Sequence, residues 1–229
     1  MNIFAIGDLH LSGSVNKPMH VFGPAWEQHD VRIAAAWRDT VRESDIVLLP
    51  GDFSWAMRGE EVRADLEYLH ALPGKKVMIR GNHDYWWNSP SKVRAMLPPS
   101  VYIVQNDCVT IEGVHIGGTR GWTCPGSAGF TENDEKLYNR EVGRLSLSLK
   151  AMPTCGLRIV MLHYPPFNEK RENSGFSERV EAEKIDIVVY GHLHGRSCRG
   201  AFEGMRNGTE YFLTSADYLH FCPKLIREV

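Results

Sequence analysis

Three kinds of segment are missing from this sequence of 229 residues. No apolar run approaches the roughly 18–20 residues that a membrane-spanning helix needs, so we expect no membrane partner. No basic segment precedes the short apolar stretch at the N-terminus, and Asp8 interrupts that stretch, so we expect no signal peptide. The five cysteines are an odd number and form no C-x-x-C pair, which is typical of reduced thiols rather than of disulfides or a zinc knuckle. Together these absences predict a cytoplasmic protein.

The chain also lacks an excess of basic residues. Lysine and arginine number 26 and aspartate and glutamate 28, which gives a formal net charge of −2. Proteins that bind the nucleic-acid backbone usually carry a strong basic excess, so a nucleic-acid partner is disfavoured. Apolar residues at 43% and charged residues at 24% are close to globular averages, which excludes wholesale disorder. Because no internal repeat or low-complexity tract divides the chain, we expect a single domain over residues 1–229.

Short apolar runs alternate with helical patterns in the first third of the chain. The expected strands cover residues 3–6, 46–49 and 77–79, and the expected helices cover residues 31–41, 60–72 and 91–97. Asp30 is placed to cap the first of these helices. A strand–helix–strand–helix–strand order of this kind predicts a parallel sheet with helices on its faces.

The rest of the chain changes character. Closely spaced strands over residues 101–104, 108–111 and 114–116 are typical of an antiparallel meander. A long helix over residues 133–152 should turn Leu137, Val142, Leu145 and Leu149 inward. Further strands are expected over residues 159–162, 185–190, 211–213 and 225–226, with a helix around residues 177–183. This order favours an α/β fold of two packed sheets with outer helices over a single doubly wound sheet.

Five polar clusters each follow an apolar strand directly. They are Asp8-Leu9-His10, Gly51-Asp52, Gly81-Asn82-His83-Asp84, Leu162-His163-Tyr164 and Gly191-His192-Leu193-His194. Each has an ordinary structural interpretation when taken alone: Gly51-Asp52 is a common turn, and a histidine such as His163 is more often a hydrogen-bonded core residue. The carboxyl ends of parallel strands, however, line one crevice. Because all five clusters occupy that position, we expect them to meet in one functional site.

The residue types in these clusters point to metal binding. Two aspartates, one asparagine and the histidines at 10, 163, 192 and 194 can fill two mixed nitrogen and oxygen shells, which suit Mn, Fe, Zn or Co better than Ca or Mg. The D-x-H and H-x-H spacings put both side chains on one face of an extended chain. His83 neighbours Asn82, so its side chain should point away from the metals and be free for proton transfer. Asp84 is placed to hold that ring in one tautomer.

The motif order D-x-H, G-D, G-N-H-D, H and G-H-x-H resembles the calcineurin-like metallophosphoesterases, a superfamily of binuclear metal hydrolases. The resemblance covers Asp8 to His194 and implies a four-layer α/β/β/α sandwich of two mixed β-sheets flanked by helices. It implies that one ion is held by Asp8, His10, Asp52 and His194. It assigns to the other ion Asp52, which bridges, together with Asn82, His163 and His192. His83 corresponds to the general acid of the family and Asp84 to its orienting partner.

Two departures narrow the expected activity. Protein phosphatases of this superfamily continue the second motif as G-D-x-V-D-R-G, whereas residues 51–59 here read GDFSWAMRG, with no acid–arginine pair in register. The fourth element, His163-Tyr164-Pro165-Pro166, is closer to that of members acting on small molecules or cyclic nucleotides. The resemblance therefore implies an enzyme that hydrolyses mono- or diesters of small molecules with a metal-activated hydroxide, and disfavours a protein phosphatase.

Two other functions compete with this one. The near-neutral net charge argues against the first, a nuclease. The second, a non-catalytic scaffold that keeps the fold, should lack some metal ligands or a counterpart of His83, whereas the full set is present here. Candidate substrate contacts are Arg120, Tyr164 and Trp55. Core packing is the simpler interpretation of Trp55, and a stacking wall for a nucleobase or aryl group is the alternative. Arg120 has two equally supported interpretations, a phosphate clamp and a surface residue. Nothing in the sequence indicates a protein partner.

Overall fold

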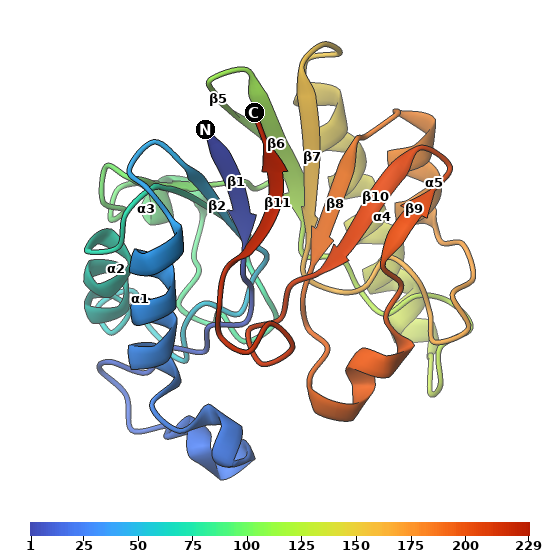
Figure 1. Ribbon diagram of the computed structural model, residues 1–229. Helices are drawn as coiled ribbons and strands as arrows, with labels where there is room; N and C mark the ends of the chain where they lie inside the picture. The colour runs from blue at the N-terminus through green and yellow to red at the C-terminus, as the bar shows by residue number, and fades with distance from the viewer.

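Two β-sheets pack face to face in the computed structural model, which describes residues 1–229, and helices cover both outer faces (Figure 1). The first sheet has the strand order β11-β1-β2-β3-β4. Its strands are β1 (Asn2–Ala5), β2 (Ile46–Leu49), β3 (Lys75–Met78), β4 (Val101–Ile103) and β11 (Lys224–Glu228). Only the β1–β11 pair is antiparallel, so the sheet is mixed. The helices on its side are α1 (His29–Thr40), α2 (Arg63–His70) and α3 (Pro90–Arg94).

The second sheet is also mixed and has the order β5-β6-β7-β8-β10-β9. Its strands are β5 (Cys108–Ile111), β6 (Val114–Thr119), β7 (Leu157–Leu162), β8 (Ile187–Tyr190), β9 (Gly204–Arg206) and β10 (Thr209–Leu213). Its helices are α4 (Glu132–Ala151) and α5 (Gly175–Ala182). Three short 3₁₀ helices lie in connecting segments: η1 (Met19–Phe22), η2 (Pro24–Trp26) and η3 (Gly195–Gly200). None of the helices combines the length and apolarity that a membrane crossing requires.

Apolar side chains alternate between the two faces of the buried strands, and this alternation produces the apolar layers on both sides of each sheet. In β1, Ile3 and Ala5 belong to the apolar core between the sheets, whereas Phe4 packs with the helices α1 and α2. In β7, Ile159 and Met161 face the same inner core, and Val160 packs on the side of α4 and α5. Successive side chains of a strand point to opposite faces, so each central strand contributes to two cores. The predicted α/β/β/α arrangement of two mixed sheets is confirmed.

The expected meander is wrong in one respect. Strand β4 pairs in parallel with β3 in the first sheet, while β5 and β6 form an antiparallel hairpin at the edge of the second sheet. The chain thus crosses between the sheets after β4. Val101 and Ile103 bury their side chains in the core beneath the helices, and Ile111 and Val114 bury theirs between the sheets. Short strands with similar patterns therefore belong to different sheets.

The helix boundaries also differ in detail. Helix α1 begins at His29 after Gln28, which is left-handed and makes no side-chain cap, so the expected cap at Asp30 is wrong. Asp30 lies inside the first turn, where a negative charge still favours the helix N-terminus. Helix α4 begins at a capping box in which Thr131 accepts from the Asp134 amide.

The inner face of α4 is supplied by Leu145 and Leu149, as expected, together with Tyr138. Leu137 and Val142, also expected to face inward, are only partly buried.

Leu145 and Leu147 form a matched pair two residues apart on α4. Leu145 is fully buried in the outer core, whereas Leu147 is 54% exposed. We expect Leu145→Ala to lower the free energy of unfolding by about 2–5 kcal/mol, because it removes buried methyl groups and leaves a cavity. Leu147→Ala should change it by no more than about 0.5 kcal/mol. Chemical denaturation of both variants checks this, and equal losses would contradict the packing of α4 on the second sheet.

Candidate metal centre

Side chains from five strand ends meet at one place in the structure. The amide of His192, beyond β8 in the second sheet, donates to the Asp8 carboxylate beyond β1 in the first sheet, at 3.0 Å. The amide of His83, beyond β3, donates to Asp52 Oδ1 beyond β2 at 2.8 Å. His163, beyond β7, lies with Nε2 at 3.5 Å from Asp52 Oδ2. All five polar clusters of the sequence therefore come together where the two sheets meet.

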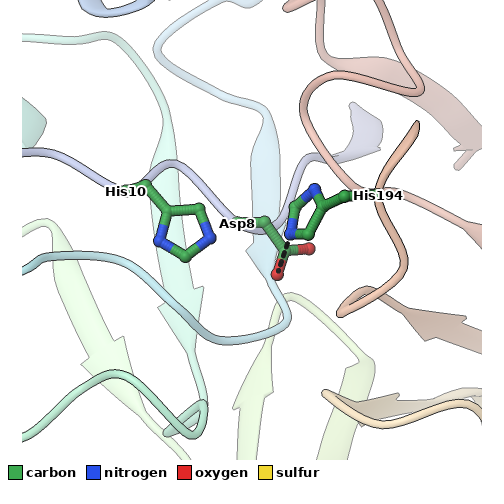
Figure 2. Close-up of side chains that lie close together, drawn as sticks. All are labelled: Asp8, His10 and His194. Carbon is green, nitrogen blue, oxygen red and sulfur yellow. Dashed lines mark ion pairs between the residues drawn. The ribbon is translucent and has the colours of Figure 1, made fainter. Parts of the chain in front are cut away.

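Asp8 and Asp52 form the acidic centre of this cluster. The two residues are 0% and 2% exposed, and every ion pair that they make is with a histidine rather than with lysine or arginine. Figure 2 shows Asp8 with His10 and His194, whose Nε2 lies 3.7 Å from Asp8 Oδ1. Two sets of potential ligand atoms each lie within 4.8 Å of one another: those of Asp8, His10 and His194, and those of Asp8, Asp52 and His163.

Asp52 lies between histidines that the family resemblance assigns to different ions. Its Oδ2 is 3.8 Å from His10 Nε2 and 3.5 Å from His163 Nε2. Asp8 also approaches His163, but through Nδ1, which already contacts the Pro50 carbonyl at 3.0 Å. That carbonyl contact leaves Nε2 of His163 free to face Asp52 and Asn82, whereas Asp8, which is common to both sets of potential ligands, meets only its Nδ1.

A second group of potential ligands surrounds Asn82. Its Oδ1 lies 2.6 Å from His163 Nε2 and 3.0 Å from His192 Nδ1. The two imidazole rings meet nearly edge to face, with centroids 5.0 Å apart and an interplanar angle of 75°. Three side chains that come from different strand ends thus present one oxygen and two nitrogens to the same space.

The protonation preferences of the cluster follow from burial. Burial raises the pKa of Asp8 to about 8, and the nearby Asp52 adds to this while His194 opposes it. Burial also lowers the pKa of His163 to about 3 and that of His192 to about 2. For His194 the effect of burial is outweighed by the hydrogen bond to Asp217 and the charge of Asp8, which raise its pKa to about 9. Without a cation, the cluster disfavours the ionised form of its own carboxyl groups.

These observations fit a pair of metal ions. Two buried carboxylates without a lysine or arginine partner are costly unless further positive charge compensates them. The imidazoles of His163 and His192 are kept neutral, which is the form that binds metal, and the buried Nδ1 of His10 has no hydrogen-bond partner. Mixed nitrogen and oxygen donors suit Mn, Fe, Zn or Co. The Asp and His groups therefore provide a plausible binuclear metal site.

The backbone is strained at four of the proposed ligands. Asp8, His10, Asp52 and His192 have φ values of 56°, 46°, 51° and 72°, in the left-handed region that non-glycine residues rarely adopt. The expectation that the D-x-H segment is extended is therefore wrong, and the H-x-H segment departs from it too at His192. Left-handed turns direct these side chains inward instead, and strain of this kind gathers at functional sites.

Asp84 does not make the contact expected of it. No hydrogen bond joins it to the His83 ring. Its fully buried carboxylate instead accepts from the amides of Phe53, Ser54 and Gly81 at 3.0, 3.2 and 2.7 Å, and from the Trp86 indole at 3.1 Å. Asp84 thus connects the loops that carry Asp52 and Asn82.

His83 itself lies beside the acidic centre and not within it. Its ring centroid is 4.6 Å from that of Trp55 and 5.9 Å from that of His10. The Nδ1 atom is buried without a hydrogen-bond partner, and burial lowers the pKa of the imidazole. The side chain lines a cleft of about 760 Å³, together with His10, Asp52 and His194.

The three candidate substrate contacts have different surroundings. Trp55 lines the cleft and stacks on His10 with ring centroids 4.8 Å apart. The ring of Tyr164 lies 4.0 Å from that of His192. The guanidinium of Arg120 is 3.5 Å from Glu141 Oε1 and lies over the Trp122 ring, and it does not line the cleft. Trp55 and Tyr164 therefore lie beside the cluster, whereas Arg120 pairs with Glu141 of helix α4.

Sequence reasoning missed two residues near the site. Asp217 Oδ1 lies 2.8 Å from His194 Nδ1, so it fixes the ring that turns Nε2 toward Asp8. It follows β10, which is parallel to β8, and the strand-end rule could have found it. Lys17 places its ammonium 3.2 Å from the Trp55 ring centroid. It comes from the irregular segment before η1, where no pattern marks it.

Comparison with solved structures agrees with the fold. A solved structure of the phosphopantetheinyl hydrolase from Mycobacterium tuberculosis covers 100% of this chain and 96% of its own, with a TM-score of 0.61 and 13% identity. A protein of unknown function from Aquifex aeolicus covers 98% of this chain and 95% of its own, with a TM-score of 0.52 and 16% identity. At such identities the likeness concerns the fold alone.

Sequence comparison identifies the family. The Gene 66 protein of Mycobacterium phage L5 is 31% identical over 83 residues, which are 36% of this chain, and the chain spans 40% of the length of that relative. The model of the family described as Calcineurin-like phosphoesterase matches residues 1–196, a range that covers most of the chain and contains every proposed metal ligand. This chain belongs to the calcineurin-like phosphoesterase family.

Proposed function

We propose that this protein is a metal-dependent phosphohydrolase that cleaves phosphate mono- or diesters of small molecules. The observation that carries the proposal is the buried pair Asp8 and Asp52, which has histidine and asparagine donors around it and no lysine or arginine partner. One ion would be held by Asp8, His10, Asp52 and His194. The other would be held by Asp52, Asn82, His163 and His192. Because these ligands come from both sheets, residues 1–229 would act as one catalytic domain.

Bound metal ions of this class supply hydroxide at neutral pH and neutralise charge on the phosphoryl oxygens. The chain's own residues orient the site. The His83 amide fixes Asp52, the Pro50 carbonyl fixes His163, and Asp217 fixes His194. Because such supporting hydrogen bonds hold these three side chains in one orientation and the two imidazoles in one tautomer, this part of the donor set is arranged before a substrate arrives.

His83 would protonate the leaving oxygen. It lines the cleft, it is not among the seven proposed ligands, and its buried Nδ1 has no internal partner. A positioned general acid is needed most when the leaving group is a poor one, such as an alkoxide. The side chain thus combines access to the cleft with freedom from metal coordination.

The cleft favours a small organic substrate. Its walls include Phe22, Trp26 and Trp55, and Lys17 lies over the Trp55 ring. Aromatic faces accept planar groups, and a neighbouring ammonium favours anions. Phe22 is 59% exposed at the rim, where a bound group would cover it. The fold neighbour from Mycobacterium tuberculosis is itself a hydrolase, of a phosphopantetheinyl group, which supports a hydrolytic role.

Substitution of the bridging carboxylate tests the proposal. Asp52→Asn should empty at least one metal position and abolish hydrolysis of bis-p-nitrophenyl phosphate, because a neutral amide cannot bridge two cations. Elemental analysis after chelation and reloading with Mn gives the stoichiometry, with two ions expected in the wild type and fewer in the variant.

Asp45→Asn is the matched control. Asp45 is equally buried but precedes β2, at the end of the strand opposite to Asp52, where it accepts from the Asn2 and Arg42 amides. This variant should keep both ions and normal turnover. Two fully occupied metal positions and normal turnover in Asp52→Asn would contradict the assignment of Asp52 as the bridging ligand.

Substitution of His83, the proposed general acid, should distinguish its role in proton transfer from a role in metal binding. His83→Ala should retain both ions, because all seven proposed ligands remain, and should slow hydrolysis by about 10²–10⁴-fold. The rate of hydrolysis should fall more for alkyl esters than for p-nitrophenyl esters, since nitrophenolate departs without much protonation. Steady-state rates on the two ester types, with metal analysis of the variant, check this. Equal losses on both types, or loss of metal, would mean that another group is the acid.

A further inference from the structure

A second cavity lies beside the cleft. It has a volume of about 360 Å³, within the range of about 300–1,000 Å³ that ligand pockets occupy. Phe167 and Phe202 form part of its apolar lining, with ring centroids 5.1 Å apart, and Asn168 and Arg196 add polar groups. The segment that carries His194 and Gly195 lines the first cleft, while Leu193 and Arg196 line the second cavity. One loop thus separates two concave sites.

The two sites share one residue, the proposed metal ligand His192. His192 is the only side chain that lines both the cleft and the second cavity. Tyr164, whose ring lies 4.0 Å from that of His192, belongs to the second cavity only. A phosphorus atom bound beside His192 would therefore lie next to both concave surfaces.

The position of His83 decides which side takes the leaving group. His83 and Asp52 line the cleft and not the second cavity. In phosphoryl transfer the attacking and leaving oxygens are roughly in line, and the other substituents of phosphorus lie around that axis. The leaving group thus belongs in the cleft with the proton donor, and the second cavity is available for a substituent that stays on phosphorus.

We infer that the protein is a phosphodiesterase whose second cavity binds the organic group retained on phosphorus. This inference rests on the proposed hydrolase function and narrows it, because a monoester carries no such group. The oxygen of one water forms a bond to phosphorus, and the bond from phosphorus to the leaving oxygen breaks. That oxygen receives its proton through His83, so the products are an alcohol and a phosphate monoester. The retained group is aryl-sized, with an apolar face for Phe167 and Phe202 and an edge that meets the polar part of the lining, which includes Asn168 and Arg196.

A series of esters with one leaving group tests this. Metal-loaded enzyme is assayed on p-nitrophenyl phosphate and on its methyl and phenyl diesters, all of which release nitrophenolate. We expect kcat/KM to be higher for the phenyl diester than for the methyl diester by about tenfold or more, since apolar groups in a fitted pocket are discriminated by that much. The monoester should be the poorest substrate.

Two substitutions narrow the cavity from different walls. Ala201→Leu and Ser127→Leu place larger side chains at lining positions, and Ala128→Leu, at an exposed neighbour outside the lining, is the control. Both cavity variants should lower the phenyl-to-methyl ratio by about tenfold, and the control should leave it unchanged. Comparing ratios removes the intrinsic reactivity of each ester, and two variants guard against one that misfolds.

Calorimetry supplies a readout that does not depend on turnover. Phenyl phosphate, the retained product, should bind more weakly to both cavity variants than to the wild type, while inorganic phosphate binds all of them equally. An unchanged phenyl-to-methyl ratio in both variants, or a wild type that prefers the monoester, would overturn the inference. Failure of the proposed function looks different: no ester then releases nitrophenolate, and phenyl phosphate binding alone decides whether the cavity takes an aryl group.

Discussion

The burial of Asp8 and Asp52 without a lysine or arginine partner is the constraint on which the rest of the site depends. Taking two carboxylates out of water is costly, and the resulting rise in the pKa of Asp8 to about 8 shows the direction of that cost. Burial keeps His163 and His192 neutral, so they cannot compensate it, and the single positive charge of His194, whose pKa is raised to about 9 and which also pairs with Asp217, cannot balance both carboxylates. A pair of multivalent cations can, and the nitrogen and oxygen donors around the carboxylates are those that transition metals accept.

The architecture concentrates these ligands at the cost of local strain. Parallel strands in both sheets end at the same edge, and left-handed residues at Asp8, Asp52 and His192 turn the side chains toward the space between the sheets. Glycines allow the close approach that results. A Cβ at Gly191 would collide with the Asp8 carboxylate, and one at Gly81 with the backbone and carboxylate of Asp52. The rigid sandwich supports this arrangement, because each central strand is anchored in two apolar cores.

Sequence patterns predicted those parts of the molecule that depend on local alternation. Strands β2 and β5 have the expected bounds, and the five clusters at strand ends meet as expected. Features set by contacts distant in sequence could not be found in this way. Arg120 pairs with Glu141 on another element, Asp84 accepts from backbone amides of two loops, and β4 joins a different sheet from β5. The exposed strand β9 has no apolar pattern to reveal it. Asp217, by contrast, follows the end of the expected strand β10, so the same strand-end pattern predicts it.

Anomalous diffraction from crystals of the Mn-loaded protein tests the central claim most directly, because it locates the ions without reference to activity. Two peaks should lie at the junction of the sheets, one among Asp8, His10 and His194 and the other among Asn82, His163 and His192, with Asp52 between them. The same data from protein treated with a chelator should lack both peaks. A single peak away from these side chains, or none in fully loaded crystals, would contradict the claim that the buried carboxylates exist to hold two metals.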